Sequence, residues 1–208
     1  MNIKTIIGLD LSISSTGLFV FSSPWKRESY EKYLIKTDTK NTMIERLDVA
    51  SDAILSHIYK HSLVFLEGYS YGSFNTEVLA QLGGIIKVGV YRETGVAPII
   101  VSPNTLKKFI LGSGKGQGKE DIKLGAYKKW GIEFKTSDEI DAYALGRLGL
   151  QVCGKEKLSF EYERECIKAL TKVKKTKKGN EKENPNTLEL QRAGIIKNKT
   201  NSLVEEML

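Results

Sequence analysis

The sequence has few cysteines and no long apolar run. Its two cysteines, Cys153 and Cys166, have no CxxC spacing, so neither a disulfide framework nor a zinc site is indicated. No apolar stretch approaches the roughly 20 residues of a membrane-spanning helix. The N-terminus has one lysine before a short apolar run that Asp10 interrupts, which is not the pattern of a signal peptide. We therefore expect a soluble, intracellular, cytoplasmic protein in a reducing compartment.

The overall composition favours one domain with an anionic partner. The chain has 208 residues, of which 40% are hydrophobic, and this is enough for a single core. Its formal net charge is +7. A basic chain favours nucleic acid as a partner, with an acidic membrane surface as the second choice.

The apolar pattern predicts strands that alternate with helices. Short apolar or alternating runs predict strands over 5–11, 17–21, 32–37, 63–66 and 98–101. Apolar residues at helical spacing predict helices over 42–60, 75–93, 103–111, 120–130, 138–152 and 160–170. No internal repeat is visible. We expect an α/β fold in which helices flank a mixed β-sheet.

The composition changes beyond residue 155. Residues 172–182 read K-V-K-K-T-K-K-G-N-E-K and include six lysines. We divide the chain into a compact domain at 1–155 and a lysine-rich, partly flexible C-terminal extension at 156–208. Its lysines would add sequence-independent contacts to DNA phosphates. Alternatively, the extension contributes to a dimer interface through its apolar residues Leu188, Leu190, Ile195 and Ile196.

Four acidic residues lie at positions in the predicted strands and helices where folding could bring their side chains together. Asp10 interrupts the first strand and Glu67 ends the fourth, while Asp138 and Asp141 share one helical face. Burial of an unpaired carboxylate is costly, so Asp10 needs a proton or a cation. Taken singly, each acid also fits a helix cap or an ion pair at a strand end. Taken together, their oxygen atoms suit Mg²⁺ or Mn²⁺.

The motifs that carry these acids resemble a known family. I-G-L-D-L-S-I-S-S-T-G, F-L-E-G-Y-S-Y, V-S-P-N-T-L-K-K-F-I-L-G-S-G-K-G-Q-G-K and D-E-I-D-A-Y-A-L-G follow one another between residues 4 and 150. In this order they resemble the RuvC family of Holliday junction resolvases, which are nucleases of the RNase H-like fold. The resemblance implies an acidic tetrad made of Asp10, Glu67, Asp138 and Asp141.

The same resemblance implies an activity and partners. The enzyme would be a crossover junction endodeoxyribonuclease: a homodimer that makes paired nicks in four-way DNA and leaves 5′-phosphate and 3′-hydroxyl ends. Two Mg²⁺ or Mn²⁺ ions about 3.5–4 Å apart would supply the attacking hydroxide and stabilise the leaving oxygen. Without metal, some of the four crowded carboxylates must take up protons. No membrane and no nucleotide cofactor are expected.

The resemblance also points to DNA contacts. Lys107, on the helix after Ser-Pro, and Lys119, after the glycine-rich loop, match lysines that lie near the scissile DNA in the family. Lys115, in the loop itself, is a candidate phosphate contact. For each of these lysines, an ordinary surface position is the alternative.

An aromatic residue at the junction centre is a further implication of the resemblance. The family inserts it from the loop after the catalytic glutamate, and here that loop carries Tyr69, Tyr71 and Phe74. Tyr71 aligns best, although any of the three could equally be a core aromatic. The loop is one residue longer than in the family, so selectivity could extend to forks and flaps.

Two other classes of protein stay open. G-L-D-L-S-x-x-S-T-G also resembles the first phosphate-binding hairpin of actin-like and sugar-kinase ATPases, but those proteins need a second lobe with its own nucleotide motif. A non-catalytic DNA-binding protein would use the lysines alone. G-S-G-K-G-Q-G-K is not a P-loop, because it is one residue too long and Glu120 stands where Ser or Thr would bind magnesium. His57 and His61 have a zinc-ligand spacing, but we expect them to be solvated.

Overall fold

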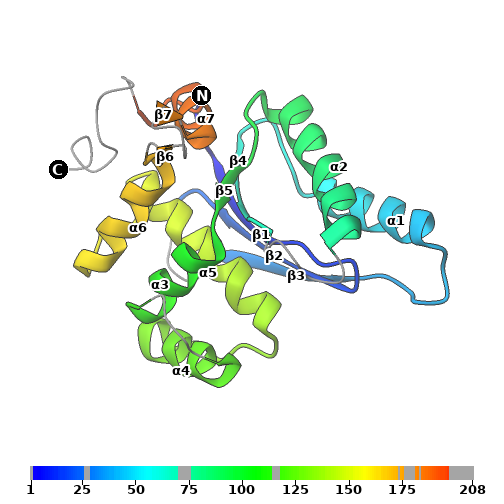
Figure 1. Ribbon diagram of the computed structural model, residues 1–208, viewed down its shortest axis with the longest axis horizontal. Coiled ribbons are helices and arrows are strands. Elements are labelled where there is room, and N and C mark those ends of the chain that lie inside the picture. Colours follow the sequence, from blue (N-terminus) through cyan, green and yellow to red (C-terminus); the bar gives the residue numbers. More distant parts are fainter. Residues whose placement is uncertain are drawn as a thin grey trace.

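A five-stranded mixed sheet forms the centre of the molecule. The computed structural model describes residues 2–25, 29–69, 76–113, 118–172, 174–175, 181–182 and 184–196. The strands are β1 (Thr5–Asp10), β2 (Ser15–Ser22), β3 (Tyr30–Lys36), β4 (Ser62–Glu67) and β5 (Ile99–Val101), in the order β3-β2-β1-β4-β5. β1 pairs antiparallel with β2 and parallel with β4, which in turn pairs parallel with β5 (Figure 1).

Helices cover both faces of this sheet. α1 (Met43–Leu55) and α2 (Thr76–Thr94) lie on one face, and α5 (Ser137–Val152) crosses the other (Figure 1). The remaining helices are α3 (Pro103–Leu111), α4 (Lys119–Trp130), α6 (Glu161–Thr171) and α7 (Pro185–Arg192). A second, two-stranded sheet pairs β6 (Lys174–Lys175) with β7 (Glu181–Lys182). The predicted α/β fold with a mixed sheet is therefore confirmed.

The two faces of the sheet carry separate cores. Successive residues of a strand point to opposite faces, so Ile7 packs toward α1 and α2 while Ile6 packs toward α5. On the α5 side, Phe19 and Tyr143 meet edge to face with ring centroids 5.3 Å apart. Burial on both faces explains why β1 and β4 read as continuous apolar runs rather than as alternating ones.

The first helix is shorter than the sequence indicates. The apolar spacing predicts a helix to residue 60, but α1 ends at Leu55. The chain then turns, with the Ile58 N–H donating to the Leu55 carbonyl at 3.0 Å, and this turn buries the Ile58 side chain. His57 and His61 therefore do not share a helix. The centroid of the His57 ring lies 3.9 Å from the centroid of the Tyr33 ring.

The hydrophobic core continues beyond residue 155. Buried residues of α6, α7 and the turn after α7 join the core on the α5 side: Cys166, Ile167, Leu170, Leu190, Ala193 and Ile196. Leu190 and Ile196, which the sequence made candidates for a dimer interface, are thus buried in the core of this chain.

Within the described residues, no helix is long and apolar enough to cross a membrane.

α7 closes the edge of the sheet at β5. The Asn186 side chain accepts from the Ile100 N–H and donates to the Ile100 carbonyl, both at 2.8 Å. The Glu189 carboxylate accepts from the Ala97 N–H at 2.8 Å. These side chains occupy the backbone groups that a further strand would otherwise pair with.

Candidate metal centre

Two neighbouring strands end in an acidic residue at the same edge of the sheet. Asp10 is the last residue of β1 and Glu67 is the last residue of β4. β1 and β4 are parallel, with Leu9 opposite Leu66, so the two carboxylates emerge side by side. The sequence places both acids directly after apolar runs, and the register of the sheet brings them together.

Glycines let α5 approach this edge closely. A Cβ on Gly8 would lie 1.9 Å from the Ala142 carbonyl oxygen, and one on Gly17 would lie 2.2 Å from the Asp138 carbonyl oxygen. Real Cβ atoms do not come this near to backbone oxygens, so only glycine permits the packing. The first turns of α5 consequently rest on β1 and β2 beside Asp10.

The start of α5 is fixed by a capping box. The Thr136 hydroxyl accepts from the Glu139 N–H at 3.2 Å, and the Glu139 carboxylate accepts from the N–H groups of Lys135 and Thr136. The same carboxylate lies 3.4 Å from the Lys32 ammonium of β3. Glu139 thereby ties the helix that carries Asp138 and Asp141 to the sheet.

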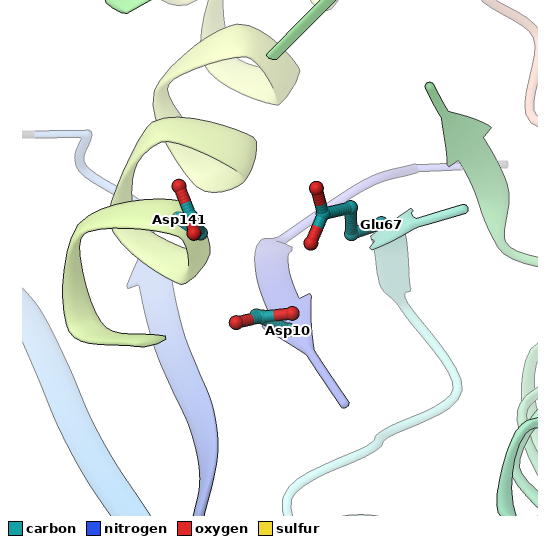
Figure 2. A group of neighbouring side chains, drawn as sticks. All are labelled: Asp10, Glu67 and Asp141. Carbon is teal, nitrogen blue, oxygen red and sulfur yellow. The ribbon is translucent and has the colours of Figure 1, made fainter. Parts of the chain in front are cut away.

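Three of the four predicted acids converge. One carboxylate oxygen from each of Asp10, Glu67 and Asp141 lies within 4.8 Å of the other two. Figure 2 shows the three side chains pointing into one shared space from β1, β4 and α5. This spacing lets oxygen ligands from three elements contact one hard cation. Asp138 lies outside the three-acid group, and its carboxylate accepts from the Ser137 hydroxyl at 3.3 Å.

The electrostatics of the cluster favour a bound cation or proton. Burial, reinforced by the charges of Glu67 and Asp141, raises the pKa of Asp10 well above its usual value. Burial also raises the pKa of Glu67. The pKa of Asp141 rises to about 7, first through burial and then through the charges of Glu67 and Asp138. Three carboxylates are therefore held where full ionisation is unfavourable without a counter-charge.

Lys107 is a basic residue beside the cluster. It lies on the exposed side of α3, whose first residue, Pro103, lines the same pocket as Asp10 and Glu67. Burial raises the pKa of Glu67 and of Asp141, and the positive charge of Lys107 partly offsets this rise. Lys107 is thus close enough to act on the charges of the site, and its contact with DNA stays a prediction.

Of the other residues predicted to contact DNA, only Lys119 and Tyr69 lie within the described part of the chain. Lys119 is exposed as the first residue of α4, and its contact with DNA stays a prediction. Lys115, Tyr71 and Phe74 lie outside the described residues.

Tyr69 lines the pocket of Asp10 and Glu67, and its hydroxyl packs against Gly83 of α2. A Cβ on Gly83 of α2 would fall 1.2 Å from the Tyr69 hydroxyl oxygen. This oxygen is buried and has no hydrogen-bond partner among the described residues. The Lys87 ammonium lies 5.1 Å from the centre of the Tyr69 ring. In this position Tyr69 is a wall of the pocket, and Gly83 provides the space for it.

Some residues that shape the site escape the sequence-based prediction. The spacing of Thr136 and Glu139 is a capping-box pattern, and it would have located the start of α5. No sequence signal links Lys32 to Glu139, because the pair joins residues 107 positions apart. The roles of Gly8 and Gly17 also depend on the packing of α5, which the sequence does not reveal.

Comparison with known proteins identifies the fold. No family model matches the sequence, and no curated protein is similar to it in sequence. Among solved structures, RuvC of Thermus thermophilus matches with a TM-score of 0.53 and 21% identity, over 68% of this chain and 90% of that one. The T. thermophilus RuvC complex with a Holliday junction substrate gives a TM-score of 0.53 and 22% identity, over 69% and 90%. The chain therefore has a RuvC-like, RNase H-like fold.

Proposed function

We propose that this chain, which has the fold of RuvC, is a metal-dependent endonuclease that resolves Holliday junctions by paired nicks. The observation that carries the proposal is the convergence of Asp10, Glu67 and Asp141 within 4.8 Å at one edge of the sheet. A fold can serve many functions, so the proposal depends on this site rather than on the likeness alone. The T. thermophilus protein in a matching structure is bound to a Holliday junction, which supports branched DNA as the substrate class.

The residues of the cluster fit divalent metal ions. Asp10, Glu67 and Asp141 offer only oxygen ligands, which are the donors that Mg²⁺ and Mn²⁺ prefer. We propose that Asp10, Glu67 and Asp141 would hold the ions, with Asp138 contributing from the preceding turn of α5. Two such ions would supply a hydroxide and stabilise the leaving oxygen.

The chain's own residues would position the DNA for hydrolysis. Hydroxide attacks the phosphorus and the bond to the 3′ oxygen breaks, which leaves a 5′-phosphate and a 3′-hydroxyl once that oxygen gains a proton. Lys107 is placed to hold the phosphate against the acids, because its charge already acts on Glu67 and Asp141. Lys115 and Lys119 would contact the flanking backbone, and Tyr71 would contact the bases at the branch, because the Tyr69 hydroxyl is packed against Gly83 of α2.

The exposed side of α2 supports a homodimer. Ile85, Val88 and Tyr91 are 41%, 49% and 47% exposed, although all three are large apolar side chains. No described residue lies within 4 Å of a Cβ placed on Gly84 beside them, so another helix has room to approach. We propose that α2 meets α2 of a second copy. A two-fold dimer presents two active sites to a four-way junction, whose nicks come in pairs.

The two alternative functions have weaker support. The hairpin of β1 and β2 resembles a nucleotide-binding hairpin, but the described residues contain one five-stranded sheet and one two-stranded pair, and no second lobe of the same kind. A protein that only binds DNA has no use for three converging, half-buried carboxylates with raised pKa values.

Cleavage of synthetic DNA tests the proposed function. We expect symmetric nicks in a labelled four-way junction with millimolar Mg²⁺ or Mn²⁺ and none with a chelator. Linear duplex, fork and flap substrates of matched sequence measure the selectivity. Binding to the junction without metal-dependent nicking would contradict the proposal.

A further inference from the structure

A second pocket lies at the opposite end of the sheet from the acidic cluster. Asp10 pairs with Gly17, whereas Thr5 pairs with Ser22, so the turn after β2 is far from Asp10 along the strands. The pocket at this turn, called the Trp25 pocket below, has a volume of about 350 Å³. Its lining includes Trp25, Trp130, Lys155, Glu156, Lys157 and Phe160. Small-molecule sites typically measure about 300–1,000 Å³, so this pocket is large enough for a ligand.

The acidic residues of the Trp25 pocket are already neutralised. The Glu163 carboxylate lies 2.8 Å from the Lys129 ammonium and also accepts from two backbone N–H groups. The Glu156 carboxylate accepts from the Arg147 guanidinium at 2.5 Å and through a second, parallel hydrogen bond. These pairs cancel one another, and the charge that remains in the pocket is positive.

Two exposed lysines supply that charge. Lys155 and Lys157 both line the pocket, and neither forms an ion pair within the described part of the chain. The Lys155 ammonium lies 5.8 Å from the centre of the Trp25 ring. One ammonium group thus lies over the Trp25 ring, and Lys157 adds a second positive charge to the lining of the pocket.

The backbone of Trp25 is held in an unfavourable conformation. Its φ of 54° lies in the left-handed region, where a bulky side chain is an outlier. Such conformations are energetically costly and concentrate at ligand sites. The Trp25 N–H donates to the Ser22 carbonyl at 3.0 Å, so the strained position is part of an ordered turn.

We infer that the Trp25 pocket binds a nucleoside phosphate, with the base stacked on Trp25 and the phosphate held by Lys155 and Lys157. Bases stack favourably on aromatic side chains whatever their sequence, and lysines contact phosphates through their charge. The ligand is either a free nucleotide or an unpaired nucleotide of a DNA strand. The inference is independent of the proposed nuclease, because the two sites share no residue.

Intrinsic fluorescence tests the pocket directly. The chain has two tryptophans, and both line the pocket. Titration of the full chain with deoxyadenosine 5′-monophosphate, excited at 295 nm in a chelator, should give saturable quenching. A titration with a short single-stranded oligonucleotide distinguishes the two sources: tighter binding of the oligonucleotide than of the free nucleotide assigns the pocket to a DNA strand. Quenching by either ligand supports the inference, and quenching by neither overturns it.

Matched variants separate the pocket from general charge effects. Lys155→Ala with Lys157→Ala should weaken binding at least tenfold, whereas Lys60→Ala with Lys168→Ala, which removes the same charge from exposed positions elsewhere, should not. Equal affinity of the two double variants would overturn the inference, as would equal binding of inorganic phosphate. Asp10→Asn should bind the nucleotide normally, so failure of the nuclease and failure of the pocket are distinguishable.

Discussion

Asp10 occupies the most demanding position in the acidic cluster. It is the acid whose pKa burial and both neighbouring carboxylates raise together. An aspartate in this position is stable either with a proton or with a cation, and the proposed nuclease would require the cation at neutral pH. Asp10 is therefore the residue at which binding of DNA and cleavage of DNA should separate.

The first prediction concerns Asp10→Asn. The change keeps the shape of the side chain but removes a metal ligand, so cleavage of a junction should fall by more than about 100-fold through the loss of several kcal/mol of charge stabilisation. Junction affinity should stay within a few-fold, because the basic surface is unchanged. Gel-shift and nicking assays on one preparation measure both. Asp52→Asn, an exposed change on α1, is the control, and near-normal cleavage by Asp10→Asn would refute the metal assignment.

The second prediction concerns the pH dependence of stability without metal. The pKa of Asp141 is about 7 in the folded chain, against a usual value of 3.8. An acid with a raised pKa binds its proton more tightly when folded, so its contribution to stability is present below about pH 4 and disappears as the pH rises toward 7. In a chelator, the melting temperature should therefore fall across this window more steeply in the native chain than in Asp141→Asn.

Metal should offset this loss of stability. At pH 8, millimolar Mg²⁺ or Mn²⁺ should raise the melting temperature of the native chain by several degrees, since each kcal/mol corresponds to about 2–4 °C for a chain of this size. Asp141→Asn should respond less to metal. Identical pH profiles for the two proteins, with no response to metal, would contradict a preformed cluster.

At the scale of single elements, the contact between α5 and the sheet determines whether the acids meet. Gly8 and Gly17 give the helix backbone direct access to β1 and β2. Asp141 can then reach Asp10 even though 131 positions separate them in the sequence. If side chains at positions 8 and 17 kept α5 further from the sheet, the helix would still carry Asp138 and Asp141, but Asp141 would not reach Asp10 and Glu67.

Gly17→Ala tests this contact. The new Cβ would lie 2.2 Å from the Asp138 carbonyl oxygen, so α5 must shift, and overpacking of this kind typically costs about 1–3 kcal/mol. We expect lower stability in urea and slower cleavage at saturating metal. Gly84→Ala, with no described residue within 4 Å of its Cβ, is the control for stability in urea and should be neutral or more stable. A fully active and stable Gly17→Ala protein would show that the close approach is not required.

The cap that α7 forms on β5 gives a fourth prediction. Asn186→Ala leaves the N–H and carbonyl of Ile100 without their side-chain partners, and we expect a loss of about 1–3 kcal/mol in the free energy of unfolding. Hydrogen exchange at the Ile100 amide should become faster. Leu188→Ala on the same helix is the matched control, because that side chain is 46% exposed. Unchanged exchange at Ile100 would argue against the cap.

At the scale of the whole molecule, the spacing of apolar residues was sufficient to predict the strands of the sheet. It was not sufficient to predict which residues pack against the edges of the sheet. The apolar runs around Ile7 and Leu66 indicate buried strands without knowledge of the rest of the fold. The five strands could therefore be predicted, and so could the convergence of Asp10 with Glu67 at the ends of two of them. The core role of Leu190 could not, because a short apolar pattern does not show which surface it covers. The position of Tyr69 depends on Gly83 of another element, and sequence spacing carries no such information.

The fifth prediction concerns assembly. Val88→Glu places a charge on the exposed side of α2, where we propose that two copies meet, and a dimer should become a monomer in light scattering. Val49→Glu is the control: Val49 is also 49% exposed, but it lies on α1. The monomeric variant should lose paired nicking of a junction while its melting temperature stays close to that of the control. A native chain that is monomeric at all concentrations would rule out this arrangement.

The distance in sequence between β5 and its cap has a consequence for synthesis. Ile100 and Asn186 are 86 positions apart, so at about 5–20 residues per second the ribosome adds the cap some 4 to 17 seconds after the strand. During that interval the nascent chain contains Asp10 and Glu67, yet its sheet has an open edge that another polypeptide can join. Translation that stalls before α7 should therefore yield products that aggregate or recruit chaperones.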